Sequence, residues 1–347
     1  MKLNESRKGS RITIKDVARD SGFTANTVSR VLRNDAKITK ATQDKILASA
    51  KRLGYVPNLL ASTLRSGTSH IVAVIVNDLH NQHFTIMLSK IDEELRKAGY
   101  NMMVLCMQLN EELGERLIHI AVSHLVDGIL YFPYHNNSKH IEYMQKHNMP
   151  FVLIDRWIQG VTADCVRCDD EMGGYLAGRH LIELGHKKFL RLAGVLASSS
   201  EIDRSKGLAR ALSEAGLSSD CVRVVPWEQS EEAIAEGSYD QIMMPLDYTA
   251  VFSFSDELAY HALNALNLLK VSIPEEVSLI SFDHIHSGIL YLPRLTSIYA
   301  TEGEDVALSA VRMLLNRIKT PGVDPQTKII QVKVYDEGTT ASPRPLT

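Results

Sequence analysis

A short segment near the N-terminus carries side chains suited to base recognition in DNA. Helical periodicity places Val28, Val31 and Leu32 on one apolar face. The polar side chains pointing away from that face are Asn26, Ser29, Arg30 and Arg33. Asn pairs bidentately with adenine and Arg with guanine in the major groove. The segment therefore predicts a helix that recognises bases, the alternative being a merely solvated helix face.

A second group of polar and aromatic side chains lies at predicted strand ends, where it could hold a small ligand. Asp283 directly follows the predicted strand 278–282, and Arg204 opens a helix after the serine-rich loop 198–200. The comparable positions in the preceding half are Phe84, Asp155 and Asp169, with Asn81 and His83 as weaker candidates. Aspartate together with arginine can hold hydroxyl groups. For each acidic residue, a helix cap or a salt bridge is the alternative.

The charge distribution separates these two groups. The 347 residues include 38 Lys+Arg and 41 Asp+Glu, a net charge of −3. Residues 1–65 hold 14 basic and 5 acidic residues, or +9, whereas the remainder holds 24 and 36, or −12. This asymmetry favours a polyanion-binding head attached to an unrelated acidic body.

Motifs for catalysis and metal binding are missing from the sequence. GxGxxG, GxxxxGK[ST], GxSxG and HExxH do not occur. His180 and Glu183 form an incomplete zincin-like pair, which we interpret as structural. Cys165 and Cys168 have metal-like spacing, but on a strand they would face opposite sides, so we expect small buried hydrophobic residues. The sequence predicts neither an enzyme nor a cofactor.

The elements that must position these residues fall into two classes. Apolar periodicity over 14–18 and 28–32, a turn at 21–23, and a third helix between Thr39 and Gly54 predict a helix-turn-helix unit. Residues 58–67 are a further helical candidate, but they are shorter than the ~12–15 residues that an isolated helix needs. We expect that helix to be ordered only when something packs on it.

From residue 70, β-rich runs alternate with amphipathic helices. The predicted strands are 71–76, 102–106, 128–132, 151–154, 189–193, 222–225, 251–254, 278–282 and 329–335. The predicted helices include 84–98, 171–185, 203–215, 257–268 and 302–318. Apolar strands separated by helices indicate parallel sheets covered on both faces, and ligands in such folds bind beyond the carboxyl ends of the strands. The fold class is therefore α/β, with an all-α helix-turn-helix head and a two-lobed, doubly wound body.

The predicted domain boundaries follow from these patterns. They are a DNA-binding domain over 1–57, a hinge helix and linker over 58–69, and an effector-binding and dimerisation core over 70–347. Within the core, we expect one lobe at about 70–168 plus 299–325 and the other at about 169–298 plus 326–347.

Several motifs identify the chain as similar to a known family. In the head they are 13–18 (TIKDVA), 27–32 (TVSRVL), 53–58 (LGYVPN) and 64–67 (LRSG). In the body they are 126–129 (VDGI), 178–186 (GRHLIELGH), 273–280 (IPEEVSLI) with 282–283 (FD), and 295–298 (LTSI). Together they resemble the lactose-repressor/purine-repressor (LacI/GalR) family of bacterial transcriptional regulators, whose body is periplasmic-binding-protein-like. The resemblance covers nearly the whole chain.

The resemblance implies roles for individual head residues. Positions matching Ala25, Asn26 and Arg30 would read bases, and those matching Thr27 and Ser29 would support backbone contacts. Leu64 from each of two subunits would wedge into a minor-groove step, flanked by Ala61 and Arg65, unless Leu64 instead packs on the body. The full predicted DNA-binding set is Thr13, Thr24, Ala25, Asn26, Thr27, Ser29, Arg30, Arg33, Asn58, Ala61, Leu64 and Arg65. A homodimer on a pseudo-palindromic operator is expected, because one head contacts too few base pairs.

The resemblance also implies an effector pocket in the body. Positions matching Arg204 and Asp283 would hydrogen-bond the effector, and Trp227 and Asp256 would line the pocket. A purine-binding member would carry a basic residue near Ser198, so the serines there favour a sugar. The full predicted effector-binding set is Phe84, Asp155, Asp169, Arg204, Trp227, Asp256 and Asp283. Effector binding would change the angle between the lobes and thereby the pairing of the hinge helices. The sequence does not show whether this change strengthens or weakens DNA binding.

Two other protein classes compete with this hypothesis. A solute-binding protein of a sugar transport system would share the body, but it needs a signal peptide and would leave residues 1–67 unexplained. An enzyme on a doubly wound fold is disfavoured by the missing motifs. The sequence lacks an apolar run near the ~20 residues that span a bilayer, so we expect a cytoplasmic protein with no membrane partner. It also lacks leucine heptads after Val334, and Asp336-Glu337 departs from the family's usual Glu-Arg.

Overall fold

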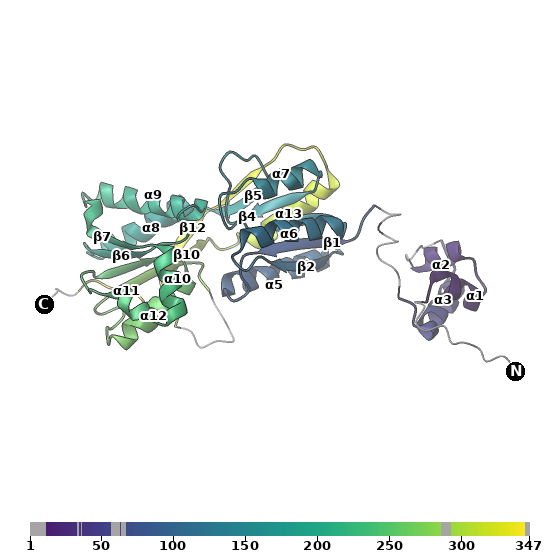
Figure 1. Ribbon diagram of the computed structural model, residues 1–347, viewed down its shortest axis with the longest axis horizontal. Helices are drawn as coiled ribbons and strands as arrows, with labels where there is room; N and C mark the ends of the chain where they lie inside the picture. The colour runs from purple at the N-terminus through teal and green to yellow at the C-terminus, as the bar shows by residue number, and fades with distance from the viewer. Residues whose placement is uncertain are drawn as a thin grey trace. The chain divides into compact units, whose positions relative to one another are not determined.

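The chain forms two compact units in the computed structural model. The structure describes residues 12–32, 35, 37–56, 63, 67–285 and 293–343. The first unit comprises Met1–Ser69 and the second His70–Thr347. Figure 1 labels most of the helices and strands of both units. Within the described residues, no helix is both long enough and apolar enough to cross a membrane.

The first unit is the predicted helix-turn-helix head. Its described helices are α1 (Ile14–Ser21), α2 (Ala25–Leu32) and α3 (Lys40–Leu53). They enclose a small core of Val17, Ala18, Val28, Val31, Ile46 and Ala50. Thr13 and Asp16 form a capping box at the start of α1, and Gly22 ends that helix in the left-handed region at φ 77°. The sharp turn that brings α2 against α1 depends on this glycine.

The N-lobe of the body contains a six-stranded sheet in the order β11-β5-β4-β3-β1-β2, and every pairing in it is parallel. Its strands are β1 (Ile71–Val76), β2 (Asn101–Cys106), β3 (Gly128–Tyr131), β4 (Phe151–Ile154), β5 (Cys165–Cys168) and β11 (Thr327–Ile330). Its helices are α5 (Gln82–Lys97), α6 (Glu111–Ser123), α7 (Lys139–Lys146) and α13 (Val306–Lys319).

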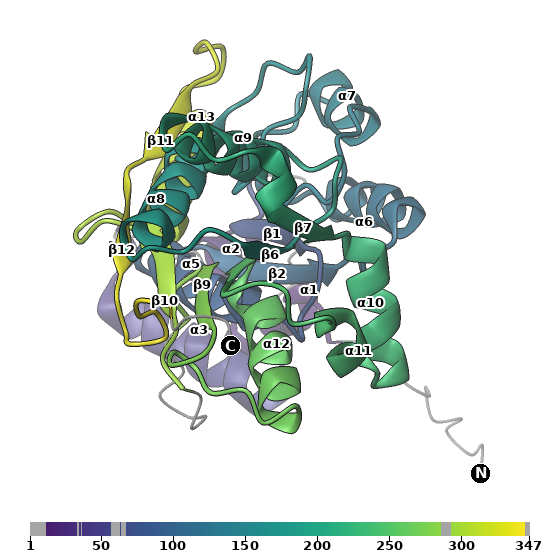
Figure 2. The same cartoon turned by 90° about the vertical axis from the view of Figure 1, so that its left-hand side faces the viewer.

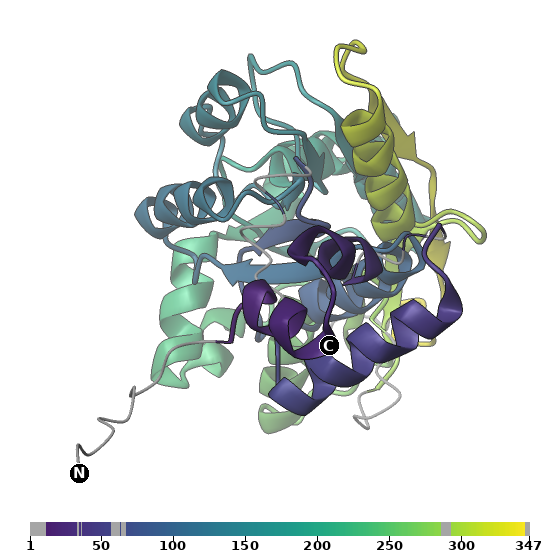
Figure 3. The same cartoon turned by 90° about the vertical axis from the view of Figure 1, so that its right-hand side faces the viewer.

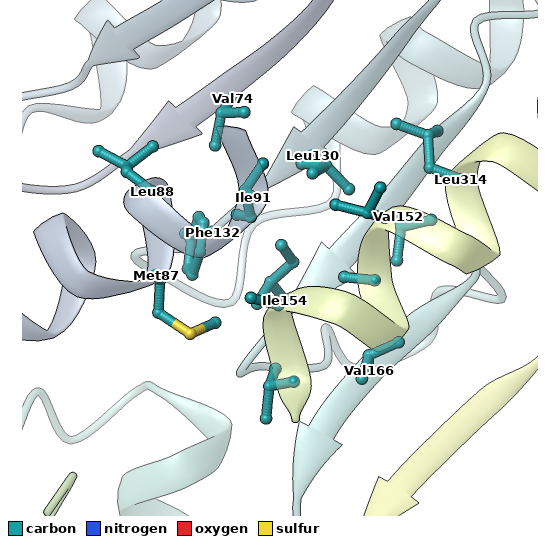
Figure 4. Close-up of a cluster of buried hydrophobic side chains, with 14 of the residues drawn as sticks. Val74, Met87, Leu88, Ile91, Leu130, Phe132, Val152, Ile154, Val166 and Leu314 are labelled. Atoms are coloured by element: carbon teal, nitrogen blue, oxygen red, sulfur yellow. The ribbon is translucent and has the colours of Figure 1, made fainter. Parts of the chain in front are cut away.

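Helices cover both faces of this sheet. Alternate residues of β1 contribute to separate cores, with Val74 on one face and Ile75 on the other. The first core lies under α5 and α13 and includes Met87, Ile91 and Leu314 (Figure 4). The second lies under α6 and α7, and Figure 3 shows these helices on the side of the sheet opposite α13. Two covered faces leave the strand ends as the place for a ligand.

The C-lobe contains a second six-stranded sheet, in the order β12-β10-β9-β8-β6-β7, which is parallel except for its edge strand β12. Its strands are β6 (Phe189–Leu192), β7 (Val222–Val225), β8 (Ala250–Ser253), β9 (Ser278–Phe282), β10 (Thr296–Ala300) and β12 (Val332–Tyr335). Its helices are α8 (Asp170–Glu183), α9 (Ser199–Glu214), α10 (Trp227–Glu236), α11 (Tyr239–Met243) and α12 (Asp256–Leu268), with a 3-10 turn at Ser219–Cys221. Figure 2 shows α8 and α9 on one side of the sheet and α10, α11 and α12 on the other.

Helices α8 and α9 pack unusually closely at two glycines. A Cβ atom on Gly174 would lie 2.1 Å from the carbonyl oxygen of Arg204, and one on Gly207 would lie 2.0 Å from that of Glu171. Only glycine allows this backbone approach. The contact brings Arg204 of α9 beside the first turn of α8.

The structure corrects the predicted strands and lobe boundary near the C-terminus. The predicted strand 329–335 is two strands, because β11 pairs with β5 in the N-lobe whereas β12 pairs with β10 in the C-lobe. The chain thus returns to the C-lobe at Gln331 rather than at 326, and residues 299–300 belong to the C-lobe sheet within β10. Strands β5 and β10 were not among the predicted strands, because polar residues interrupt their short apolar runs.

Candidate functional site

Helix α2 presents the predicted base-reading face of the head. The hydroxyl of Thr24 accepts a hydrogen bond from the Thr27 backbone N–H at 3.2 Å and so begins the helix. Val28 and Val31 are buried, while Asn26 is exposed. The helical wheel predicted that Ser29 points outward, and this prediction is wrong, because Ser29 is only 8% exposed. Its hydroxymethyl group is too short to extend past the packed helices.

Arg30 is held in place by a contact within the head. Its Nε donates to the Asp35 carboxylate at 2.8 Å, and the backbone N–H of Lys37 donates to the same carboxylate at 3.0 Å. These hydrogen bonds lower the pKa of Asp35, the Lys37 N–H being the larger cause. The pair engages Nε only, so the terminal nitrogens of Arg30 remain for a base. The other predicted DNA contacts, Arg33, Asn58, Ala61, Leu64 and Arg65, lie outside the described residues.

A cavity of about 260 Å³ lies between the two lobes of the body. It is lined by the residues that follow β1, β4, β5, β8 and β9, together with the first turns of α5, α8, α9, α10 and α12. Six of the seven predicted effector-binding residues line it, namely Phe84, Asp155, Asp169, Arg204, Trp227 and Asp283. Parallel strands end at one edge of each sheet, which explains why residues far apart in sequence meet here.

On the N-lobe side, His83 lies between two carboxylates. Its Nε2 is 2.8 Å from Oδ2 of Asp155, and its Nδ1 is 3.8 Å from Oδ1 of Asp283 in the C-lobe. Burial alone lowers the pKa of His83, but the negative charges of Asp283 and Asp155 outweigh it and raise the pKa to about 9. Asp155 and Asp283 both adopt positive φ, 67° and 101°, which is unusual for residues with a side chain.

On the C-lobe side, Arg204 is fixed by several partners. Its Nε donates to Asp170 at 2.8 Å, its Nη1 donates to the carbonyl of Phe254, and its guanidinium lies 4.0 Å from the Phe282 ring centroid. Burial raises the pKa of Asp170 to about 6, although the Arg204 charge opposes the rise. The predicted serine-rich loop is the beginning of α9, with Ser198 as its N-cap, so Arg204 lies in the second turn.

Asp256 was predicted to line the pocket, and this prediction is wrong, because Asp256 is not among the residues that line the cavity. It is 1% exposed and accepts hydrogen bonds from Ser281, Ser297 and the Ile285 N–H. Burial, together with the charge of Asp283, raises its pKa to about 7. Its position at the start of α12 turns the carboxylate inward over β9 and β10, while its neighbour Glu257 reaches the cavity. Asp256 therefore supports the strand-end loop that carries Asp283.

The lobes also contact each other directly at both edges of the cleft. Asn81 accepts a hydrogen bond from the backbone of α5 and donates to Glu257 of the C-lobe at 2.7 Å. At the other edge, the indole N–H of Trp157 donates to Asp203 at 3.0 Å, and its backbone N–H donates to Ser199 at 3.0 Å. The lobes are thus closed over the cavity.

Sequence reasoning underrated His83 and missed several lining residues, namely Tyr134, Arg156, Asp170, Glu231 and Glu257. A usable signal was available for two of them. Asp170 and Glu257 are acidic residues in the first turn of helices that follow strands. In a doubly wound lobe, such turns face the same edge as the strand ends.

The Cys165/Cys168 and His180/Glu183 motifs have other contacts in the structure. Cys165 and Cys168 are free and lie on β5, and burial raises the pKa of Cys165 to about 12, which keeps its thiol protonated. His180 contacts Thr340, while Glu183 accepts from Arg179. Throughout the described ranges, no group of three or more His, Cys, Asp or Glu side chains could hold a metal ion.

Comparison with known proteins agrees with this arrangement. A profile described as "Bacterial regulatory proteins, lacI family" matches residues 13–58. A second, "Periplasmic binding proteins and sugar binding domain of LacI family", matches residues 69–338. The HTH-type transcriptional repressor PurR of Vibrio atlanticus is 30% identical over 318 residues, covering 88% of this chain and 92% of that protein.

Solved structures show the same fold. A LacI family transcriptional regulator from Enterococcus faecium with bound ribose is 26% identical and has a TM-score of 0.68, covering 79% of this chain and 100% of that one. The Lac repressor dimer bound to operator and the anti-inducer ONPF is 22% identical, with a TM-score of 0.77 over 96% of this chain and 100% of that one. The α/β fold class and the helix-turn-helix head are therefore confirmed. With a DNA-binding head and a ligand-binding body in one chain, and regulators rather than enzymes as its relatives, the protein belongs to the LacI family of bacterial transcription regulators.

Proposed function

We propose that this protein represses transcription in the cytoplasm by binding a pseudo-palindromic operator as a homodimer, and that a sugar in the cleft changes its affinity for DNA. The proposal rests on two features found in one chain. Helix α2 has an exposed Asn26 and an Arg30 held by Asp35, and the body has a cavity lined by both lobes. A transport solute-binding protein is not favoured, because residues 13–58 match the DNA-binding profile.

Base recognition by α2 can be tested by selecting bound DNA from a random pool. Replacing Asn26 or Arg30 by Ala is expected to cost about 1–3 kcal/mol of operator binding and to relax the preference at one position of each half-site. Lys45→Ala, at an exposed position of α3, is the matched control. A cation that contacts only phosphate weakens binding to all sequences alike and leaves the selected motif unchanged. An unchanged motif for both α2 variants would contradict the assignment.

A sugar effector is supported by the chemistry of the cleft. Carboxylates and Arg204 can hold hydroxyl groups, and the aromatic rings of Trp227 and Phe84 can cover the C–H face of a sugar ring. The ribose bound by the Enterococcus faecium regulator adds support. Isothermal titration of the full chain with panels of sugars and purines provides the test, and tight purine binding without sugar binding would overturn this part of the proposal.

Coupling between the two sites is the remaining element of the proposal. If a ligand changes operator affinity by some factor, operator DNA must change the ligand's affinity by the same factor. Measuring both factors with one sugar, together with the mass of the DNA complex by analytical ultracentrifugation, tests the coupling and the dimer. The direction of the change separates an inducer from a corepressor. A ligand that binds without altering operator affinity would disprove the regulatory role of the cleft.

A further inference from the structure

The cavity carries more negative than positive side chains. Its lining carboxylates are Asp78, Asp155, Asp169, Asp170, Glu231, Glu257 and Asp283. Its lining basic residues are His83, Arg156, Arg204 and His261, and burial lowers the pKa of His261. Charge of one sign concentrated between low-dielectric walls selects ligands of the opposite sign.

Both guanidinium groups of the lining are already engaged by the protein. Arg204 pairs with Asp170 and donates to the Phe254 carbonyl. Arg156 donates to the carbonyls of Pro133 and Tyr134 at 3.1 and 2.9 Å. A phosphate or carboxylate on a ligand is usually held by a bidentate arginine. Arg156 uses only Nη1 in these contacts, so it is the excess of carboxylates in the lining, and not a lack of guanidinium donors, that disfavours anionic ligands.

Three of the carboxylates come together from opposite lobes. Asp78 follows β1 in the N-lobe, whereas Glu257 and Asp283 belong to the C-lobe. Burial and the negative charges of Asp78 and Asp283 raise the pKa of Glu257 to about 7, against the hydrogen bond from Asn81. Basic side chains offset part of this charge: His83 is 3.8 Å from Asp283, Arg204 also interacts with Asp283, and His80 is 2.9 Å from Asp78. The remaining repulsion among Asp78, Glu257 and Asp283 favours a cationic ligand group between the lobes.

Asn77, the residue before Asp78, has a buried hydrogen-bond acceptor without a partner in the described part of the protein. Asn77 lines the cavity and is 3% exposed, and the acceptor is its side-chain oxygen Oδ1. Buried polar atoms are nearly always satisfied, and leaving one unpaired costs roughly 1–3 kcal/mol. This oxygen independently indicates that a ligand supplies a donor at the same end of the cavity.

We propose that the effector carries a primary ammonium group, held at this end of the cavity by Asn77, Asp78, Glu257 and Asp283, and hence that it is an amino sugar. The inference rests on the proposed function, in which the cavity binds a sugar. An ammonium has three N–H donors and no acceptor, which matches an unpaired amide oxygen and several carboxylates in one cavity lining. It joins Asp78 of one lobe to Glu257 and Asp283 of the other, and so stabilises the closed body.

Matched ligand sets test the proposal on the full-length protein. Glucosamine, galactosamine and mannosamine are each compared with the parent hexose, the N-acetyl derivative and the 6-phosphate, by thermal shift and isothermal titration at a pH where the amine is protonated. We expect at least one free amine to bind tenfold or more tightly than its hexose and N-acetyl counterparts, and a 6-phosphate to give no gain. The proposal is wrong if no amine binds, or if a neutral or phosphorylated counterpart binds as tightly.

Single substitutions locate the ammonium. Glu257→Gln and Asp78→Asn should each weaken the amine at least tenfold more than they weaken the hexose, whereas Glu112→Gln, exposed on α6, should change neither affinity. Equal losses for amine and hexose would place the ammonium elsewhere and overturn the assignment. The proposed function and the amino-sugar proposal can fail separately. If a neutral sugar shifts operator affinity and the amines do not, the proposed function stands and the amino-sugar proposal is wrong. If no sugar of any class binds, the sugar effector itself fails.

Discussion

The two walls of the cleft differ in where their polar groups find partners. In the C-lobe, Arg204 is held by Asp170 and Phe254, and Asp256 is held by serines of β9 and β10, all within that lobe. In the N-lobe, Asn81 and Trp157 bond across the cleft, and His83 faces a carboxylate across it. Arg204 and Asp256 of the C-lobe therefore have these partners before the lobes meet, whereas Asn81, Trp157 and His83 of the N-lobe each gain a further partner only when they do.

This difference assigns separate tasks to the two lobes. A prebuilt wall loses little order on binding, so we expect contacts with Arg204 on the C-lobe side to cost little conformational entropy. Contacts that exist only in the closed body contribute to the free-energy difference between the open and closed states. A ligand shifts the equilibrium between these states only through contacts that differ between them. The N-lobe therefore reports closure. Substitutions in the two walls should accordingly have different consequences.

The largest effect is expected for Arg204→Ala. It leaves Asp170, which is 3% exposed, without its counter-ion, and breaking a buried pair in this way costs about 3–5 kcal/mol. The free energy of unfolding, measured by urea titration, should fall accordingly, and ligand binding should be lost. Arg210→Ala is the control on the same helix, because its pair with Glu171 is surface-exposed and worth about 0–1 kcal/mol. Equal losses for both variants would show that the C-lobe wall is not prebuilt.

The next effect is a pH dependence carried by His83. The pKa of this residue in the folded protein, about 9, exceeds its ordinary value of 6.5, so protonation stabilises the closed body. The contribution is complete below about pH 6.5, declines as the pH rises, and is lost through about pH 9. It amounts to at most about 3 kcal/mol. At pH 6, the thermal midpoint of His83→Gln should be lower than that of the unsubstituted protein, and between pH 6.5 and 9 it should change less. If both proteins have the same pH profile, the His83 imidazolium does not stabilise the closed body.

A smaller effect is expected for Trp157→Phe at the opposite edge of the cleft. The substitution keeps an aromatic ring but removes the N–H that donates to Asp203 across the cleft, at a cost of about 1–2 kcal/mol. Because that contact exists only in the closed body, ligand affinity should fall about five- to thirtyfold. Small-angle scattering without ligand should show a larger radius of gyration than for the unsubstituted protein. An unchanged radius would mean that this edge does not hold the lobes together.

An effect of similar size is expected for Asn81→Ala. It removes one cross-cleft hydrogen bond to Glu257 and the side-chain cap of α5, together worth about 1–2 kcal/mol. Asn81→Asp is the informative partner variant, because it keeps the cap but brings another negative charge to Glu257. If the cross-cleft bond matters, Asn81→Asp should weaken closure more than Asn81→Ala, as measured by ligand affinity. The reverse order would assign the role of Asn81 to the cap alone.

Much of the site could be predicted from the sequence because strand ends are local features. An apolar run followed by Asp283 or Asp155 marks the carboxyl end of a buried strand, and six of seven predicted effector residues do line the cavity. Asp256 was misplaced because its sequence position does not show whether the start of α12 points toward the cavity or toward the sheet beneath it. The split of 329–335 into β11 and β12 escaped prediction for a similar reason, since the two strands differ only in which sheet they join.

The sequence by itself determined most of the elements and their order, the family and the separation of a basic head from an acidic body, because periodicity, caps and charge act over a few residues. Only the tertiary structure decided which charges meet. His83 and Asp155 are 72 positions apart and meet because parallel strands of the N-lobe sheet end at one edge. Asn81 and Glu257 are 176 apart and meet because the two lobes face each other. The crowding of Asp78, Glu257 and Asp283 is likewise a property of two closed lobes, since electrostatic interaction depends on distance in space and not along the chain.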